Sequence, residues 1–267
     1  MTESHQPRKR FGQHFLVDNH AIKKIIHALH PQQMDNLVEI GAGTGALTNH
    51  IVEQVEHLHI VEIDNDLVIR LKGMYPPSKV SIHHQDALTF DFGDLFHPNA
   101  PLRVFGNLPY NISTPLLFHL LQYATKIHDM LFMLQKEVIV RMCAKPGTSD
   151  YGRLSIMIQY ACQTQMLFDI PPQAFAPPPK VMSSLIILKP YGDKRPHPLA
   201  NHYETFAHIV NVAFQHRRKT LKNALQTCVS AEVFEKVGID AIRRPETLSV
   251  SEYVMLSNAI ERPFLDT

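Results

Sequence analysis

A short apolar run passes directly into a glycine-rich turn in Leu37-Val38-Glu39-Ile40-Gly41-Ala42-Gly43-Thr44-Gly45. Apolar runs of this length are typical of buried strands. Glycines after a strand let the backbone approach a ligand closely and turn into a helix N-terminus. Gly41, Gly43 and Ala46 also match the dinucleotide pattern Gly-x-Gly-x-x-Gly/Ala. The stretch predicts a nucleotide-binding strand–turn–helix unit, and a plain glycine-rich turn is the alternative.

Strand-like and helix-like patterns alternate around this unit over the first two-thirds of the chain. A helix that starts at Asp18 or Asn19 and stops before Pro31 comes first. The expected strands are residues 37–40, 58–63, 80–83, 102–105 and 130–134, and the expected helices between them are 46–54, 66–72 and 115–123. Such alternation with short loops predicts an α/β fold, a parallel sheet covered by helices on both faces.

Two later apolar runs, residues 166–170 and 184–188, flank a segment with five prolines in ten residues, 171–180. Proline fixes its backbone angle and lacks an N–H donor, so this segment cannot be a helix or a central strand. We expect a stiff, extended loop. The two strands that it joins are expected to form an antiparallel pair at one edge of the sheet.

The last part of the chain is expected to be a small helical domain. Residues 190–202 have the composition of a linker, and Phe206, Ile209 and Val210 beyond them share one helical face. Ser249 and Glu252 have the spacing of a capping box for the last helix. We therefore expect one domain over residues 1–192 and a second over 198–267.

The composition limits the class of protein. A net charge of +1 and 45% hydrophobic residues exclude wholesale disorder and a collagen-like repeat. The three cysteines are widely spaced, which excludes a disulfide scaffold and a Cys-x-x-Cys site and fits a reducing compartment. No run approaches the roughly 18 apolar residues of a membrane helix, and residues 1–12 lack the apolar part of a secretory signal. We expect a soluble cytoplasmic protein with no membrane partner.

Two acidic residues follow the next two expected strands. Glu62 comes 21 residues after Gly41, a distance that suits a carboxylate binding a ribose diol. Asp86, which follows the expected strand 80–83, can accept a hydrogen bond from an adenine amino group. These residues keep a nicotinamide-dependent dehydrogenase among the alternatives.

The tetrapeptide Asn107-Leu108-Pro109-Tyr110 follows the fourth strand. Such tetrapeptides at this place mark methyltransferases that act on planar amines, although in isolation this one could be a plain turn. An amine conjugated to a ring is a poor nucleophile because its lone pair is delocalised. Asn107 and a carbonyl near Leu108 can accept its N–H bonds and direct the lone pair toward an electrophile. Tyr110 can stack on the base. A dehydrogenase has no use for this tetrapeptide.

In its ordered motifs the sequence resembles the ribosomal RNA adenine dimethyltransferases, most closely the bacterial small-subunit type. The resemblance covers residues 10 to about 260 and rests on these stretches: 9–16, 39–45, 61–64, 85–87, 105–113, 134–138, 151–155, 175–184 and 217–221. It implies a Rossmann-like, seven-stranded sheet that binds S-adenosylmethionine, mostly parallel with an antiparallel edge, and a small C-terminal α-helical domain. Residues 1–192 would be the catalytic domain, and 198–267 would bind RNA or the ribosome.

The resemblance also implies the activity and its site. It implies dimethylation of the 6-amino groups of two adjacent adenosines near the 3′ end of 16S rRNA, in a late precursor of the small ribosomal subunit. No metal is implied. The catalytic residues would be Asn107, Leu108, Pro109, Tyr110 and Phe175. The residues that bind S-adenosylmethionine would be His14, Leu16, Gly41, Gly43, Glu62, Ile63, Asp86, Ala87 and Asn107. Many family members have Asn where this chain has His14.

RNA contacts are expected from the proline-rich loop and from basic clusters. Phe175 would sandwich a base opposite Tyr110, or it is a core aromatic that anchors the loop. The residues expected to bind RNA phosphates are Arg10, Lys180, Arg217, Arg218, Lys219, Lys222, Arg243 and Arg244. We expect a monomer, because no interface stripe is evident.

Two alternatives remain open besides the dehydrogenase. A related enzyme could methylate large-subunit rRNA, although the match over residues 171–184 and the helical tail favour the small-subunit type. The chain could also act in ribosome assembly mainly by binding, and both roles could coexist.

Overall fold

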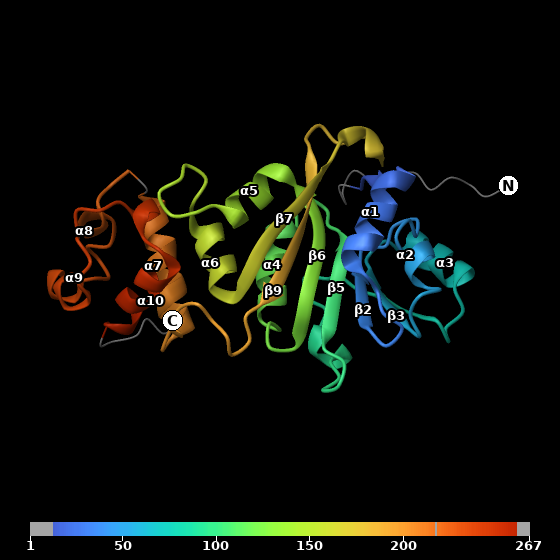
Figure 1. Ribbon diagram of the computed structural model, residues 1–267, viewed down its shortest axis with the longest axis horizontal. Coiled ribbons are helices and arrows are strands. Elements are labelled where there is room, and N and C mark those ends of the chain that lie inside the picture. The colour runs from blue at the N-terminus through green and yellow to red at the C-terminus, as the bar shows by residue number, and fades with distance from the viewer. Residues whose placement is uncertain (1–12, 217, 261–267) are drawn as a thin grey trace. The chain divides into compact units, whose positions relative to one another are not determined.

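The computed structural model describes residues 13–216 and 218–260 (Figure 1). The strands of its main sheet are β2 (Asn36–Ile40), β3 (Leu58–Glu62), β4 (Val80–His84), β5 (Leu102–Asn107), β6 (Ile127–Gln135), β7 (Cys162–Ile170) and β9 (Ser183–Pro190). They lie in the order β4-β3-β2-β5-β6-β9-β7. The first five strands pair in parallel, and β9 pairs antiparallel with β6. The predicted mostly parallel sheet of seven strands with an antiparallel edge is confirmed.

The strand order creates a crevice at one end of the sheet. The chain runs outward from β2 through β3 to β4, then returns to place β5 on the other side of β2. The connections after β2 and β5 therefore leave in opposite directions. Ligands of parallel α/β sheets bind at this kind of switch point, beyond the carboxyl ends of the strands. The glycine-rich turn after β2 and the tetrapeptide after β5 both lie there.

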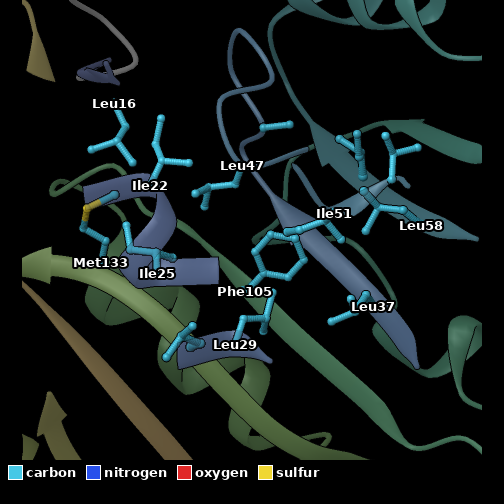
Figure 2. Close-up of a cluster of buried hydrophobic side chains, with 14 of the residues drawn as sticks. Leu16, Ile22, Ile25, Leu29, Leu37, Leu47, Ile51, Leu58, Phe105 and Met133 are labelled. Atoms are coloured by element: carbon cyan, nitrogen blue, oxygen red, sulfur yellow. The ribbon is translucent and has the colours of Figure 1, made fainter. Parts of the chain in front are cut away.

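Helices cover the sheet because one face of each is apolar. The helices are α1 (Asn19–Leu29), α2 (Thr48–Ile51), α3 (Asn65–Met74), α4 (Ser113–Leu121) and α5 (Lys136–Cys143). Figure 2 shows Ile22, Ile25 and Leu29 pointing from α1 into a cluster that includes Phe105 and Met133 of the sheet. Asp18 caps α1 by accepting from the N–H groups of residues 20 and 21. The expected helix over 46–54 is shortened to four residues, because turns occupy both of its ends.

A second, two-stranded sheet was not foreseen. It pairs β1 (Phe15–Leu16) antiparallel with β8 (Phe175–Ala176), which lies in the proline-rich segment. The N–H groups of residues 17 and 18 also donate to the carbonyl oxygen of Ala174. These bonds hold the start of the described chain beside a segment about 160 positions away in sequence.

The contacts divide the chain into two compact units. One unit holds Met1–Ile139 and Gln165–Pro190, and the other holds Val140–Thr164 and Tyr191–Thr267. The expected division kept all residues up to 192 in the first domain. The difference arises because α6 (Arg153–Ala161) packs against α7 (Tyr203–Gln215) and α10 (Val250–Asn258) of the second unit.

The second unit is helical, as expected. Besides α6, α7 and α10, it contains α8 (Leu221–Ala224) and α9 (Ala231–Val237). Phe206, Ile209, Val210 and Ala213 are all buried on one face of α7. Ser249 and Glu252 form the expected capping box on α10, each accepting from the other's backbone N–H. No helix in the described part of the chain is long and apolar enough to cross a bilayer.

Candidate active site

A cavity of about 270 Å³ lies at the carboxyl ends of β2, β3 and β5, where the topology predicts a ligand site. It is lined by most of the residues that the sequence indicated. Those residues are His14, Leu16, Gly41, Gly43, Glu62, Ile63, Asp86, Ala87, Asn107, Leu108, Pro109 and Tyr110. Four strand ends, those of β2, β3, β4 and β5, and the N-terminal segment therefore contribute to one cavity.

Glu62, at the end of β3, is held by two backbone donors. The N–H of Gly43 donates to its Oε2 at 3.2 Å, and the N–H of Asp64 donates to its Oε1 at 3.0 Å. Burial raises the pKa of this carboxyl, while these two bonds act in the opposite direction. Gly43 has a φ of +59°, and a Cβ there would come within 3.0 Å of the Phe15 ring. Glycine is therefore needed both for the turn and for the space between Glu62 and β1.

Asp86, which follows β4, and Ile63, which follows β3, also line the cavity. The Oδ1 atom of Asp86 accepts from the Leu88 N–H at 2.9 Å, which fixes the turn after β4. Ile63 is 43% exposed although it is apolar, and it lines the cavity beside the buried Ala87. An acceptor beside apolar side chains suits a flat heterocycle with an exocyclic amine.

Asn107, the last residue of β5, joins the tetrapeptide to the N-terminal segment. Its Nδ2 donates to the carbonyl oxygen of His14 at 2.8 Å. No donor in residues 13–216 and 218–260 is bonded to its Oδ1, so this oxygen is available as an acceptor. The N–H of Leu108 donates to the carbonyl of Met133 at 3.2 Å, which fixes the backbone of the tetrapeptide.

Tyr110 is oriented by two neighbours. Its hydroxyl shares a hydrogen bond of 2.7 Å with Ser183 Oγ. Its ring stacks on the His14 imidazole, with centroids 5.8 Å apart and an interplanar angle of 28°. His14 Nδ1 lies 2.7 Å from the carbonyl oxygen of Pro177, to which it donates. Burial raises the pKa of Tyr110, so the phenol stays protonated at neutral pH.

Of the two places expected for Phe175, the structure supports the one in the core and corrects the one opposite Tyr110. Its side chain is 3% exposed, belongs to the hydrophobic core and does not line the cavity. Phe175 pairs with Leu16 across β1 and β8, and both side chains belong to the core cluster, so the ring anchors the loop. The aromatic ring that faces Tyr110 is that of His14.

The residues expected to bind RNA fall into three groups. The first group is exposed and consists of Lys180, Arg218, Lys219, Lys222 and Arg244. Arg243 is instead engaged within its own unit, because its guanidinium pairs with Glu252 at 2.5 Å and donates to the Thr247 carbonyl at 2.7 Å. Arg10 and Arg217 lie outside the described residues.

Glu39 is a cavity residue that the sequence prediction left out. It is 2% exposed, lines the cavity and accepts from Thr48 Oγ1 at 2.6 Å. Burial raises its pKa to about 7, and repulsion from Glu62 adds to this effect. The sequence did contain a signal for Glu39, because an acidic residue inside the apolar run 37–40 is unusual for a buried strand. Ser183, which orients Tyr110, gave no signal because serine is common in loops and strand ends.

Comparison with known proteins identifies the family. The family model described as ribosomal RNA adenine dimethylase matches residues 4–262. The chain belongs to the ribosomal RNA adenine dimethylase family. This confirms the resemblance stated from the motifs and shows that the protein is a methyltransferase.

Curated relatives of this family match the chain over nearly its whole length. The ribosomal RNA small subunit methyltransferase A of Alcanivorax borkumensis is 53% identical over 264 residues, which cover 99% of this chain and 93% of that protein. The protein of the same name from Nitrosospira multiformis is 50% identical over 258 residues, which cover 97% and 98%.

Among solved structures, a dimethyladenosine transferase from Plasmodium falciparum has the same fold. Its TM-score is 0.78 at 24% identity, and the match covers 91% of this chain and 96% of that chain. The predicted Rossmann-like sheet is therefore shared with a known dimethyladenosine transferase.

Proposed function

We propose that this protein transfers methyl groups from S-adenosylmethionine to the 6-amino groups of two adjacent adenosines near the 3′ end of 16S rRNA. The acceptor is a late precursor of the small ribosomal subunit. One observation carries the proposal. The tetrapeptide Asn107-Leu108-Pro109-Tyr110 begins at the last residue of β5 and lines the same cavity as Glu62 and Asp86. The names of the relatives, which are about half identical over nearly the whole chain, support the choice of the small subunit.

The donor set of the cavity fits S-adenosylmethionine. Glu62 presents a carboxylate that suits ribose hydroxyls, and Asp86 presents an acceptor for an adenine amine. Leu16, Ile63 and Ala87 supply apolar surface for the ring. The carboxylates of Glu39 and Glu62 favour a ligand with positive charge. When bound, S-adenosylmethionine supplies an electrophilic methyl group on a positively charged sulfur.

Asn107 would orient the acceptor amine. Its Oδ1 and the main-chain carbonyl of Leu108 accept the N–H bonds of the adenine amino group. The nitrogen lone pair then points away from the ring plane, and the two dipoles stabilise the positive charge that develops on nitrogen. Alignment of this kind can supply up to about 7–11 kcal/mol.

The neighbouring residues would hold the base and make room for a second methyl group. Pro109 stiffens the loop, and Tyr110 stacks on the base, which is worth about 1–3 kcal/mol. The target adenosine must leave its stacked arrangement to enter the cavity. The methylated nitrogen is acidic and loses its proton to water, so the reaction needs no strong base from the protein.

The direct test is transfer of labelled methyl from S-adenosylmethionine to small ribosomal subunits from a strain that lacks the modification. The RNA is then digested and its nucleosides are identified. We expect dimethyladenosine at two adjacent positions, with naked RNA a poor acceptor. Label in large-subunit RNA would show instead that the substrate is large-subunit rRNA. Tight subunit binding without transfer would leave a role in assembly alone.

A further inference from the structure

A basic groove lies beside α1, outside the cavity. Its lining includes four polar side chains of α1, together with Ala28 of the same helix and two residues of β7: His20, Lys23, Lys24, His27, Ala28, Leu167 and Phe168. The four α1 side chains are exposed, whereas Leu167 and Phe168 are partly buried and pack against the core. Basic groups therefore stand over an apolar floor.

The outward face of α1 carries charge of one sign only. Its apolar residues point into the core, as Figure 2 shows for Ile22, Ile25 and Leu29. Between Asn19 and Leu29 there is no acidic residue. The exposed face of α3 differs, because Asp66 accompanies Arg70 and Lys72 there. A helix face that contacts only solvent commonly carries charges of both signs, as the exposed face of α3 does.

Among the described residues no acid pairs with either lysine of the groove, although Asp18, which caps α1, interacts electrostatically with His20. Lys23 and His27 have no ion pair among the described residues, and Lys24 Nζ lies over the Phe168 ring, 4.1 Å from its centroid. The nearest acid on β7, Asp169, is bonded to Lys136 at 2.6 Å and to Ser184 Oγ at 2.6 Å. Lys23 and Lys24 are thus exposed and have no carboxylate partner in the part of the chain that the structure describes.

The helix that lines the groove begins, in sequence, directly after a strand that lines the cavity. Phe15 and Leu16 of β1 line the cavity, and α1 begins three residues later. From His20 to His27 the helix rises by about 10 Å. This length corresponds to about three nucleotide steps at ~3.4 Å each. An RNA strand that inserts one base into the cavity could continue along α1.

We infer that this groove binds the single-stranded RNA flanking the target adenosines, with Lys23 and Lys24 on phosphates and with the Phe168 ring open to a base once Lys24 has moved from the ring to a phosphate. The inference rests on the proposed function for the identity of the RNA. Lysines over an aromatic floor are the combination that binds single strands with little sequence preference. The groove would extend the substrate contact of the first unit beyond the residues at the cavity.

The test compares two double variants with the same change in charge. In Lys23→Gln/Lys24→Gln the groove loses both lysines, and in Arg70→Gln/Lys72→Gln the exposed face of α3 loses two cations. Binding of a labelled single-stranded RNA from the 3′ end of 16S rRNA is measured between 50 and 300 mM salt. Melting and S-adenosylmethionine affinity check that each variant is folded. Lys23→Gln alone serves if the double variant melts early.

We expect the groove variant to bind RNA about tenfold more weakly at 0.1 M salt. The slope of log affinity against log salt should fall by about 1.4, or ~0.7 for each lost phosphate contact. The α3 variant should match the wild type. Equal losses in both variants, or no loss in the groove variant, overturn the inference. Binding to anionic vesicles and to an acidic peptide is measured as well. If the groove variant loses either of these and its RNA binding is unchanged, the inference is also overturned.

Failure of the proposed function appears differently. It would be seen as wild-type protein that transfers no methyl group to small subunits. The groove is judged from RNA binding alone, so a lysine-dependent salt slope supports it whether or not transfer occurs.

Discussion

The cavity wall and the basic surface of the helical unit use polar side chains in different ways. At the cavity, each key group is fixed by a backbone or side-chain partner: Gly43 and Asp64 hold Glu62, and Asn107 holds His14. On the helical unit, Arg218, Lys219, Lys222 and Arg244 are exposed. A reaction that depends on alignment requires fixed groups. Phosphate binding requires only charge within reach.

The difference has a practical consequence for reading sequence motifs. Fixed polar groups occur at constrained places, such as strand ends, so their sequence signal is specific. Surface cations give a weak signal, because one arginine can bind RNA while its neighbour stabilises the fold. Arg243 and Arg244 illustrate this, since only Arg243 is paired with Glu252.

The largest effect is expected for Asn107→Ala. Loss of the Oδ1 acceptor should lower kcat by about 100-fold or more, because the lone pair of the acceptor amine is no longer directed. Melting temperature should change little. Asn107→Asp, which keeps an acceptor oxygen, should retain more activity than Asn107→Ala. The exposed Asn99→Ala is the matched control. Near-normal turnover in Asn107→Ala would contradict the assigned role.

Glu62→Gln should come next. The carboxylate forms charge-assisted bonds to hydroxyls, worth about 1.5–3 kcal/mol, so the dissociation constant for S-adenosylmethionine should rise about 10–100-fold. Calorimetry measures this without any RNA. Glu56→Gln, at an exposed position, should bind normally. Equal affinity in the two variants would remove Glu62 from the binding site.

Glu39 should make binding of S-adenosylmethionine depend on pH. Its pKa of about 7 means that it is partly protonated in the free protein. A positively charged ligand favours the carboxylate, so binding releases a proton. Affinity should therefore increase from pH 6 to pH 8, by up to about tenfold, and level off above. Glu39→Gln should flatten this profile. A steep profile in that variant would assign the titration to another group.

The smallest effects are expected for two adjacent arginines. Arg243→Gln should lower the free energy of unfolding by about 1 kcal/mol, because it breaks a partly exposed ion pair, and should leave the salt dependence of RNA binding unchanged. Arg244→Gln should do the reverse and reduce the salt slope by about 0.7. Chemical denaturation and RNA titration of both variants check this. If both arginines affect both properties alike, the distinction between paired and exposed cations fails.

Much of the fold follows from local patterns. The apolar runs became strands, and the Ser249–Glu252 box became a helix cap, because strand burial and capping depend on nearby residues. The order of the strands, the pairing of β1 with β8 and the assignment of residues 140–164 to the second unit depend on contacts between distant segments. Gly106 is an example: a Cβ there would lie 2.3 Å from the Ile40 carbonyl, which only the pairing of β5 with β2 brings close.

The sequence by itself indicated the family through its ordered motifs, and it placed the strands and the residues at their ends, because apolar runs and turn residues act locally. Only the tertiary structure decided which of those side chains meet and how they are held. It placed the His14 ring, rather than Phe175, on Tyr110, and it brought Ser183 to the tyrosine hydroxyl. It also buried Glu39 beside Glu62, which raises the pKa of Glu39. These outcomes depend on burial and on distances across the fold, which no local pattern of residues encodes.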